Sequence, residues 1–513
     1  MRVGAQGRCG SVPKKDRENA YPFFVAIRVG IDCSRTAPPF RMDWYVMTGI
    51  VTFASGNPKP IFSRVVQRSM IRSMTARLSA MMFLEFFVWG AWYVTVGNYM
   101  VVHGMADLTH WPYTVNPIAA IIAPFFLGLV ADRFFPTEKV LGTLHLLGGL
   151  VMFFVPAATG SPTLFILLLL GYNLCYMPTL GLANSLAFHH IDDQEKQFPM
   201  IRVFGTIGWI VAGLFISIVL GAFVVGQVPD ETAWPLYTTA VGSIILGLYS
   251  FSLPHTPPPA RGEKVSLRSI TGIDALKHLG SRSFYVFIIS SMLICIPLAA
   301  YYNFAPIFVN NAIYTEGAGP FSGLAGLLRE SVFPSPASLL SLGQMSEALF
   351  MVLMPFFFVR LGVKWMLVAG MGAWVLRYGL FAIGAPDGLF WMIVLGVLLH
   401  GLSYDFFFVT GQIYVDKKST PAIRGQAQGF LVLVTYGIGL GIGAQVIGAL
   451  NNALRGGADV LSPEIWQQFW IYPAGFALAV AIFFSLMFRD RVLPKGGVSE
   501  GDVSAAAAAE KGM

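Results

Sequence analysis

Charged residues are scarce in this chain of 513 residues. Asp, Glu, Lys and Arg make up 12% of the sequence, whereas soluble domains carry about 25%. Hydrophobic residues account for 55% and aromatic residues for 14%. This composition excludes an ordinary soluble domain and predicts a polytopic membrane protein. The net charge of +7 does not indicate a nucleic-acid partner, because the basic residues lie in short loops between apolar runs.

Cysteine is also rare, and familiar catalytic motifs are missing. The four cysteines show neither the spacing of a metal site nor that of a disulfide framework. The sequence has no Walker A loop and no HExxH motif, so nothing supports an ATP-driven pump or a membrane metalloprotease of these kinds. We therefore expect no enzyme activity, no metal and no cofactor.

Long apolar runs recur from Leu78 onward. A spanning helix needs about 20 residues, and runs of this length predict twelve spans. These are 79–103, 112–131, 139–157, 163–188, 201–225, 234–253, 284–311, 337–359, 364–384, 389–414, 423–449 and 466–488.

The spans group into two six-helix bundles, at 76–253 and 284–488. The stretch between them, 254–283, is rich in proline and then basic, which is typical of a linker. Residues 1–75 form an extension that we expect to be disordered, or to precede a true start near Met70 or Met74. The tail at 489–513 is expected to be disordered. Lys and Arg gather in one set of loops, so the positive-inside rule places both termini in the cytoplasm.

Two short sequences occur once in each half. Pro199-Met-Ile-Arg202 resembles Pro421-Ala-Ile-Arg424, and Pro124-Phe-Phe resembles Pro355-Phe-Phe. Each span in the first half thus matches the span six places later, as in parallel transporter repeats. The loop at 128–133, Gly-x-x-x-Asp-Arg, is also similar to the loop 2–3 signature of the major facilitator superfamily.

Acidic side chains stand inside several predicted spans. A charge at membrane depth costs from about 2.5 kcal/mol upward, so it faces a cavity or a partner. Asp405 lies among Tyr404 and three phenylalanines, which predicts a polar pathway through the bundle. Glu85, in the first span, either faces that pathway as a proton or substrate group or pairs with a basic residue on a neighbouring helix.

Polar residues in the fifth and eighth spans are further candidates. Gln344 and Glu347 are three apart and project from one helix face. Together they can hold a sugar hydroxyl or a base edge by two-way hydrogen bonding, or they can hold helices together. Arg202 either snorkels to the interface or reaches the cavity floor beside Thr206.

Two more polar residues favour structural roles. We expect Arg377, in the ninth span, to pair with an acid such as Glu347 or Asp405. His400 is expected to be a polar contact within the bundle rather than the proton carrier. Aromatic residues are plentiful, and a few on a cavity wall would form a stacking slot for a planar ligand.

Several ungapped blocks resemble the nucleoside:proton symporter family of the major facilitator superfamily. They are FLEFFVWGAWYVTVGNYM in the first span, YMPTLGLANSLAF and FPMIRVFGTIGW around the fourth and fifth, SLGQMSEALF in the eighth, WVLRYGLFA in the ninth, and YDFFFVTGQIYVDKKSTPAIRGQAQG from the tenth onward. The similarity runs from about Met81 to Phe488.

This resemblance implies an all-α polytopic protein with the major facilitator fold, twelve transmembrane helices in two halves. It also implies proton-driven nucleoside uptake by alternating access. The expected partners are a nucleoside, a proton and the lipid bilayer of the bacterial inner membrane, for a chain that works as a monomer. The alternative is a major facilitator transporter of another small polar solute, such as a sugar or a drug.

The resemblance also implies a set of site residues. The family's binding set falls on Arg202, Thr206, Trp209, Gln344, Glu347, Tyr404 and Asp405, and the proton-coupling candidates are Glu85, Glu347 and Asp405. The seventh span departs from the bacterial permease, because Ala299 and Tyr302 stand where the permease has Gln and Asn. Tyr302 and the adjacent Asn303 therefore complete the expected site.

Overall fold

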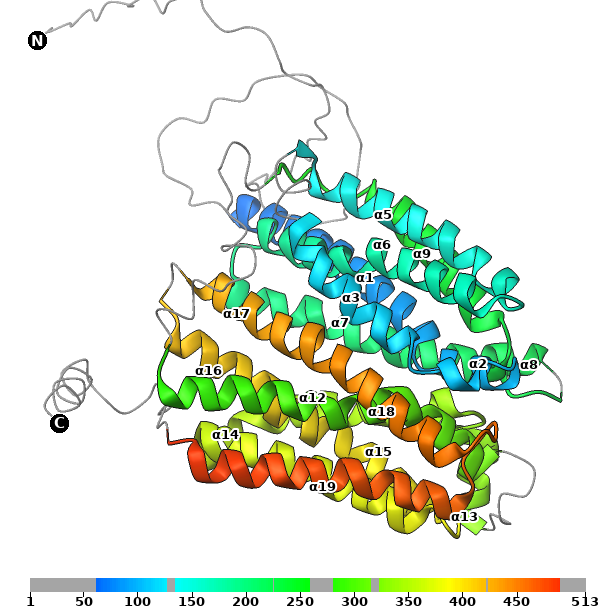
Figure 1. The fold of residues 1–513 in the computed structure, drawn as a ribbon. Helices are drawn as coiled ribbons and strands as arrows, with labels where there is room; N and C mark the ends of the chain where they lie inside the picture. Colours follow the sequence, from blue (N-terminus) through cyan, green and yellow to red (C-terminus); the bar gives the residue numbers. More distant parts are fainter. Residues whose placement is uncertain are drawn as a thin grey trace, which may run out of the picture. The chain divides into compact units, whose positions relative to one another are not determined.

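The computed structural model of the protein (Figure 1) describes residues 61–126, 134–224, 226–258, 280–314, 323–420 and 423–489, with the backbone alone for 61–72, 124, 126 and 194–196. Four predicted features fall wholly or largely outside these residues: the extension, the 128–133 signature, the linker and the tail. By its internal contacts the chain divides into Met1–Val65 and Val66–Met513, and the second unit contains all the candidate residues.

The first half of the described chain is entirely helical. Its elements are α1 (Ile61–Tyr93), α2 (Val96–Val102), η1 (Ala106–Leu108), α3 (Pro112–Phe126), α5 (Thr137–Phe154), η3 (Pro156–Ala158), α6 (Pro162–His189), α7 (Gln194–Leu214), η4 (Phe215–Leu220), α8 (Gly221–Phe223), η5 (Pro229–Glu231) and α9 (Trp234–Ser250).

The second half is helical as well. Its elements are α12 (Arg282–Val309), η6 (Asn310–Tyr314), α13 (Gly323–Leu327), η7 (Leu328–Val332), α14 (Pro336–Gly384), α15 (Phe390–Tyr404), η8 (Asp405–Val409), α16 (Thr410–Lys418), α17 (Arg424–Val432), η9 (Leu433–Gly439), α18 (Leu440–Arg455) and α19 (Pro463–Met487). The segments η4, η6, η7, η8 and η9 are π-helical, whereas η1, η3 and η5 are 3₁₀ turns.

Nine helices within the described ranges are long and apolar enough to cross a membrane. One of them, α14, is 49 residues long and contains the predicted eighth and ninth spans. The two arms of α14 meet at Gly362, whose φ of 63° and ψ of 177° interrupt the helix. Because only glycine adopts this conformation without strain, the single residue turns the chain where the sequence predicts a short loop. The helices α3 and α9 are shorter, at 15 and 17 residues.

Local sequence signals explain where several helices begin and end. The Ser281 side chain accepts a hydrogen bond from the Phe284 amide and caps α12. Ser335 forms a capping box with Ser338 at the start of α14, directly before Pro336. Serine caps and a proline in the first turn satisfy or remove amides that have no partner within the helix.

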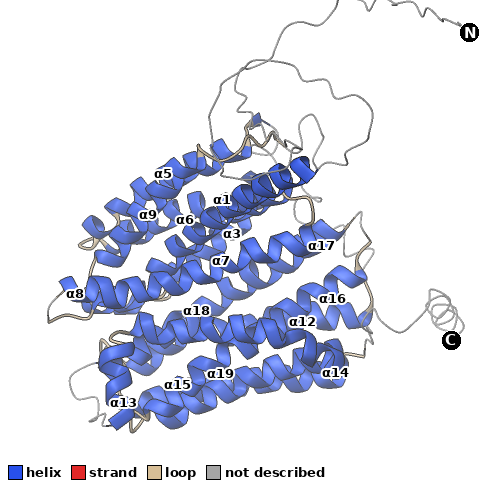
Figure 2. Cartoon of the chain, turned by 180° about the vertical axis from the view of Figure 1, so that it is seen from behind, coloured by secondary structure: helices blue, strands red, loops and turns tan. Residues whose placement is uncertain are grey.

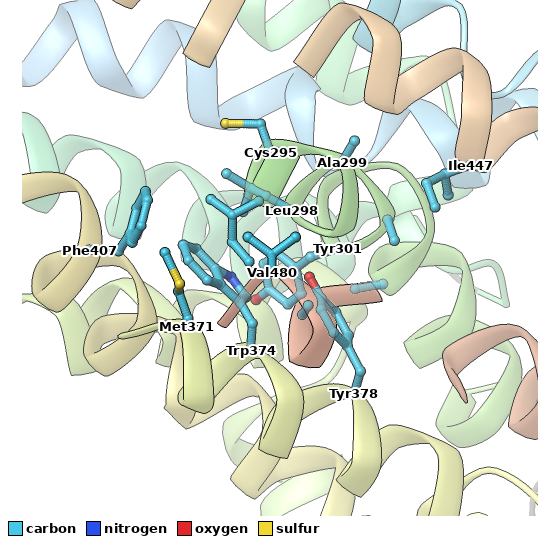
Figure 3. Close-up of a cluster of buried hydrophobic side chains, with 14 of the residues drawn as sticks. Cys295, Leu298, Ala299, Tyr301, Met371, Trp374, Tyr378, Phe407, Ile447 and Val480 are labelled. Atoms are coloured by element: carbon cyan, nitrogen blue, oxygen red, sulfur yellow. The ribbon is translucent and has the colours of Figure 1, made fainter. Parts of the chain in front are cut away.

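The core of the second half lies between α12, α14 and α19. Trp374, Tyr378 and Tyr301 are buried there, and Figure 3 shows them packed between these helices with Leu298 and Val480. The Tyr378 hydroxyl donates a hydrogen bond to the Pro297 carbonyl and so joins α14 to α12. This packing holds the helices that carry the candidate site.

The helices form two groups that follow the two halves of the sequence (Figures 1 and 2). In Figure 1 the first group, coloured blue to green, includes α5, α6 and α9, and the second, coloured green to red, includes α12, α14 and α19. The groups meet where α7 lies against α14 and α3 lies against α18.

Polar side chains join the two groups at the end of the bundle that carries η1, η5 and η7. Among the described residues, these hydrogen bonds include the pairs Asn98–Pro306, Asn310–Glu231, Gln445–Thr114 and Arg455–Asp107. The two groups are therefore fastened together at this end.

Candidate functional site

Helix α7 contributes three candidate residues from the first half. Arg202 is half-buried, and its guanidinium lies 4.1 Å from the centre of the Phe86 ring on α1. Thr206, one turn later, and Trp209 are also half-buried. The Trp209 ring contacts the ring of Trp89 at 5.3 Å. These side chains line the side of α7 that faces α1.

A glycine explains how α7 approaches α1 so closely. A Cβ atom at Gly208 would lie 2.1 Å from the Phe83 carbonyl oxygen on α1. No side chain larger than hydrogen fits there, so the two backbones touch. The glycines that the sequence shows beside Thr206 therefore serve helix packing.

Helix α14 contributes Gln344 and Glu347 from the second half. Both side chains are half-buried. Helix α15 packs directly behind them, since a Cβ atom at Gly401 would lie 2.4 Å from the backbone nitrogen of Glu347. The Glu347 carboxylate lies within electrostatic reach of Arg202 on α7 and Tyr404 on α15. The predicted residues of the fifth, eighth and tenth spans are thus brought together.

Asp405 begins the π-helical segment η8. Its side chain is fully buried, and neither carboxylate oxygen has a hydrogen-bond partner in the described structure. The Glu347 carboxylate is within its electrostatic reach. Two carboxylates near one another in an apolar bundle repel when both are ionised, which favours sharing a proton. Short π-helical segments occur frequently at functional sites.

Tyrosines and a histidine form contacts between the two halves close to these acids. Tyr302 on α12 contacts Tyr93 on α1, with ring centres 5.7 Å apart. His400 stacks on Tyr301 at 5.2 Å and lies 5.7 Å from Tyr404. The aromatic residues expected to line a cavity thus form one connected group across the halves.

The sequence analysis missed one member of this group. The Tyr436 hydroxyl is hydrogen-bonded to the Tyr404 hydroxyl, which places η9 beside the site. The sequence signal for Tyr436 is that it is a single tyrosine within the glycine-rich run of the predicted eleventh span. Asn303, which was expected to belong to the site, is fully buried, and no hydrogen bond joins its amide to the other candidate residues.

Glu85 lies apart from these residues. Its carboxylate accepts hydrogen bonds from Thr179 at 2.6 Å and lies 2.9 Å from Nε2 of His145, and Tyr176 donates to its backbone oxygen. The side chain is fully buried among α1, α5 and α6. The sequence left two alternatives for Glu85, a group facing the polar pathway or a partner of a basic residue on a neighbouring helix. This geometry matches the second, and the basic residue is His145.

The predicted acid partner of Arg377 is wrong for the described structure. Its Nη2 donates to the Ser403 hydroxyl at 2.9 Å, and its guanidinium lies 4.2 Å from the centre of the Tyr301 ring. Neither Glu347 nor Asp405 forms an ion pair with it, because the aromatic ring and the hydroxyl occupy its surroundings. A cation over an aromatic face is stabilised by the negative charge of the π-system.

Known proteins share this chain's sequence and fold. The family model described as nucleoside H+ symporter matches residues 72–492. The chain is 38% identical to YegT of Escherichia coli over 81% of this chain and 94% of YegT. It is 31% identical to the nucleoside permease NupG of Escherichia coli over 81% of this chain and 96% of NupG.

The fold comparison agrees with the sequence comparison. A crystal structure of the nucleoside transporter NupG superposes with a TM-score of 0.69 at 30% identity, covering 82% of this chain and 100% of that chain. The fold is thus all-helical and similar to that of major facilitator transporters. The resemblance inferred from the sequence blocks is confirmed, and the chain belongs to the nucleoside H+ symporter family.

Proposed function

We propose that this chain carries nucleosides into the cell together with protons, by alternating access across the bacterial inner membrane. Its family consists of transporters, and proton-coupled nucleoside transport is what the family assignment supports. One observation carries the proposal: Arg202 from the first half lies within electrostatic reach of Glu347 and Tyr404 from the second half, and Glu347 in turn lies within reach of Asp405. A site shared by two halves opens to alternate sides when the halves rock.

The chemistry of these residues suits a nucleoside. Gln344, Glu347 and Asp405 offer acceptors and donors for ribose hydroxyls and base edges. Trp209 and Tyr404 offer flat faces for stacking of the base, and Tyr302 extends this aromatic wall. Thr206 belongs to the proposed binding set through the family resemblance, and Asn303 belongs to it as the amide beside the seventh-span positions that depart from the family.

We assign the proton to Asp405 or Glu347 before Glu85. Asp405 is buried without a hydrogen-bond partner among the described residues, and an intramembrane acid of this kind is functional by default. The Glu85 carboxylate has two partners within the first half, His145 and Thr179. The proton gradient then supplies the energy for accumulation, and no further cofactor is required.

The proposed topology has twelve spans and cytoplasmic termini. The nine candidate spans become twelve when α14 counts as two and the shorter α3 and α9 are added. Basic residues of the described chain such as Arg282, Arg360 and Lys364 lie at the end opposite η1, η5 and η7, so the positive-inside rule makes the latter the outer end. We propose a monomer, because each chain carries both halves of the site.

Uptake of labelled uridine and adenosine tests this function. The chain is expressed in cells that lack their own nucleoside transporters, with and without a protonophore. Uptake that collapses with the protonophore is the expected result. The same cells without this chain provide the background.

Absence of uptake from a protein that reaches the membrane would overturn nucleoside transport. A competition panel of sugars then tests the alternative cargo. Uptake that survives the protonophore would overturn proton coupling while leaving the substrate class in place.

A further inference from the structure

A buried carboxylate joins the two halves at the outer end. Asp230, on η5, is fully buried. Its Oδ2 accepts a hydrogen bond from the Ser335 hydroxyl at 2.6 Å, and its Oδ1 accepts one from the Ala337 backbone N–H at 2.9 Å. The Asp230 side chain from the first half therefore occupies the N-terminus of α14 in the second half, where amides without helical partners favour a negative charge.

A second side chain of the first half extends this contact. The Ser217 hydroxyl, on η4, lies 2.5 Å from the Ser335 hydroxyl and accepts a hydrogen bond from the Ser338 backbone N–H at 2.9 Å. All of these side chains are at most 2% exposed. We call Ser217, Asp230, Ser335 and the amides of Ala337 and Ser338 the outer clasp.

The backbones beside the outer clasp touch each other. A Cβ atom at Gly213, near the end of α7, would lie 2.3 Å from the Ser341 hydroxyl and 2.8 Å from the Ala337 carbonyl oxygen on α14. This packing leaves no room for water between the helices. Separating them exposes every polar group of the clasp at once.

The clasp connects the two helices that carry opposite walls of the proposed site. Helix α14 bears Gln344 nine residues after Ser335, which is about 13 Å along the axis. Helix α7 bears Trp209 four residues before Gly213. Any opening of the site to the outer side moves these two helices apart at their outer ends.

We propose that Asp230 is a positioning residue of the transport cycle, whose side chain holds α7 and α14 together while the outer end is closed and leaves the N-terminus of α14 when that end opens. This inference rests on the proposed function only for the identity of the cargo. The closing and opening of the outer end is measured without any nucleoside.

The outer clasp also has a defined response to protons. Burial raises the pKa of Asp230 from 3.8 to about 7, although the hydrogen bonds from Ser335 and Ala337 act in the opposite direction. Once the outer end opens, water solvates the carboxylate and its pKa falls back toward 3.8. The closed state has the higher pKa and binds the proton more tightly, so acid favours closure and the clasp loosens as the pH rises through about 7.

Among the described residues, few other ionisable groups lie near the clasp. Glu231, beside Asp230 on η5, accepts a hydrogen bond from Asn310 and raises the pKa of Asp230 further. Tyr314 at the end of η6 faces Asp230, and the Arg329 guanidinium on η7 lies 5.8 Å from the Tyr314 ring. Helices α2 and α9 also pack against η5 and carry tyrosines as their only titratable residues, and neither η4 nor the first turn of α14 carries one.

This direction suits a proton-driven importer. In the outward-open state Asp230 is exposed to the external medium, so the proton that it binds as the outer end closes comes from outside. Neutralisation removes the cost of burying the carboxylate. Closure of the outer end is thus coupled to uptake of an external proton, as inward transport requires.

Cysteine labelling from outside tests the clasp. Thr109 is 1% exposed at the outer end and lies beside Asn451 and Phe304 of the second half. Thr109→Cys, in a chain whose four native cysteines are replaced, reacts with a membrane-impermeant maleimide only when this end opens. The rate is measured in proteoliposomes at pH 5.5 and pH 8.5, without nucleoside.

Three backgrounds are compared. The labelling rate of the chain that retains Asp230 is divided by the rate of Asp230→Asn at each pH. This ratio is expected to be about 30-fold higher at pH 8.5 than at pH 5.5, because the pKa of Asp230 is about 7 in the closed state and 3.8 in the open state. Asp230→Asn mimics the neutral acid and keeps the end closed at both pH values. Asp230→Ala removes the carboxylate that accepts hydrogen bonds from the Ala337 amide and the Ser335 hydroxyl. In this background we expect Thr109→Cys to be labelled fast at both pH values.

The control variant is Glu464→Gln. Glu464 stands at the start of α19 at the same end, is exposed, and accepts a hydrogen bond from Ser462 within its own half. Its replacement is expected to leave the rate and its pH dependence unchanged. The proposal is overturned when Asp230→Asn labels with the same pH dependence as the unaltered clasp, or when both Asp230 variants label at the unaltered rate. Ser335→Ala, which removes one donor only, repeats the test if Asp230→Ala does not reach the membrane.

Discussion

Nε2 of His145 lies 2.9 Å from the carboxylate of Glu85, and both side chains are sealed from solvent. The other ring nitrogen of His145 is hydrogen-bonded to Ser243 on α9 at 3.1 Å. The pair thus connects α1, α5 and α9 within the first half. An acid held in this way contributes to the integrity of one bundle.

Replacing Glu85 with Gln should therefore lower stability more than it alters coupling. The amide loses the charge-assisted contact with His145, and we expect a loss of about 1–3 kcal/mol in the free energy of unfolding. Thermal unfolding of the purified protein measures this loss. Uptake per molecule should keep its pH dependence, and a collapse of accumulation at unchanged stability would make Glu85 the proton carrier instead.

Asp405→Asn should abolish accumulation and spare exchange. The amide keeps the shape of the side chain but no longer cycles a proton. We expect the internal nucleoside concentration to level off at the external one, while labelled nucleoside still exchanges with unlabelled nucleoside across the membrane. The matched control is Asp416→Asn, because Asp416 is 46% exposed on the same stretch of chain and pairs with Arg424. Accumulation that persists in Asp405→Asn would assign the proton to Glu347.

Trp209→Leu should weaken substrate binding by removing a stacking surface. Aromatic pairs contribute about 0.5–1.5 kcal/mol beyond their area, which corresponds to a rise in KM of about 2- to 12-fold. Trp365→Leu is the control, since the Trp365 side chain on α14 is 56% exposed. Equal KM values for the two variants would remove Trp209 from the binding site.

Gly401→Ala should damage transport through Glu347. The new methyl group would lie 2.4 Å from the Glu347 backbone nitrogen, so α15 must move away from α14, at a cost of about 1–3 kcal/mol. Gly379→Ala, on α14, meets nothing within 4 Å and should transport normally. The comparison is made by uptake at equal amounts of protein in the membrane. Normal uptake by both variants would show that the position of Glu347 is not critical.

The sequence was sufficient to predict the helices and most of the residues that lie close together at the candidate site. Apolar runs located the spans because membrane depth restricts composition, and the repeat of Arg202 and Arg424 indicated two related halves. The convergence of Arg202, Glu347 and Asp405 was inferred from family resemblance, and the structure brings these residues within electrostatic reach.

Side-chain partners across helices were beyond prediction. His145 lies 60 residues from Glu85, and no periodicity within either helix indicates that their faces meet. The contacts of Arg377 are the Tyr301 ring and the Ser403 hydroxyl, whereas charge pairing alone suggested an acid. The clasp at Asp230 joins a loop to a helix end 105 residues away, and its burial appears only once the halves are packed.

The turn at Gly362 has a consequence for how the protein is made. The two arms of α14 follow one another without a polar loop, and Arg360 and Lys364 flank the turn. During synthesis no soluble loop separates the first arm from the second, so nothing delays the second arm once the first has emerged from the ribosome. We therefore expect residues 336–384 to enter the bilayer as one hairpin, with the two cations remaining together on one side of it.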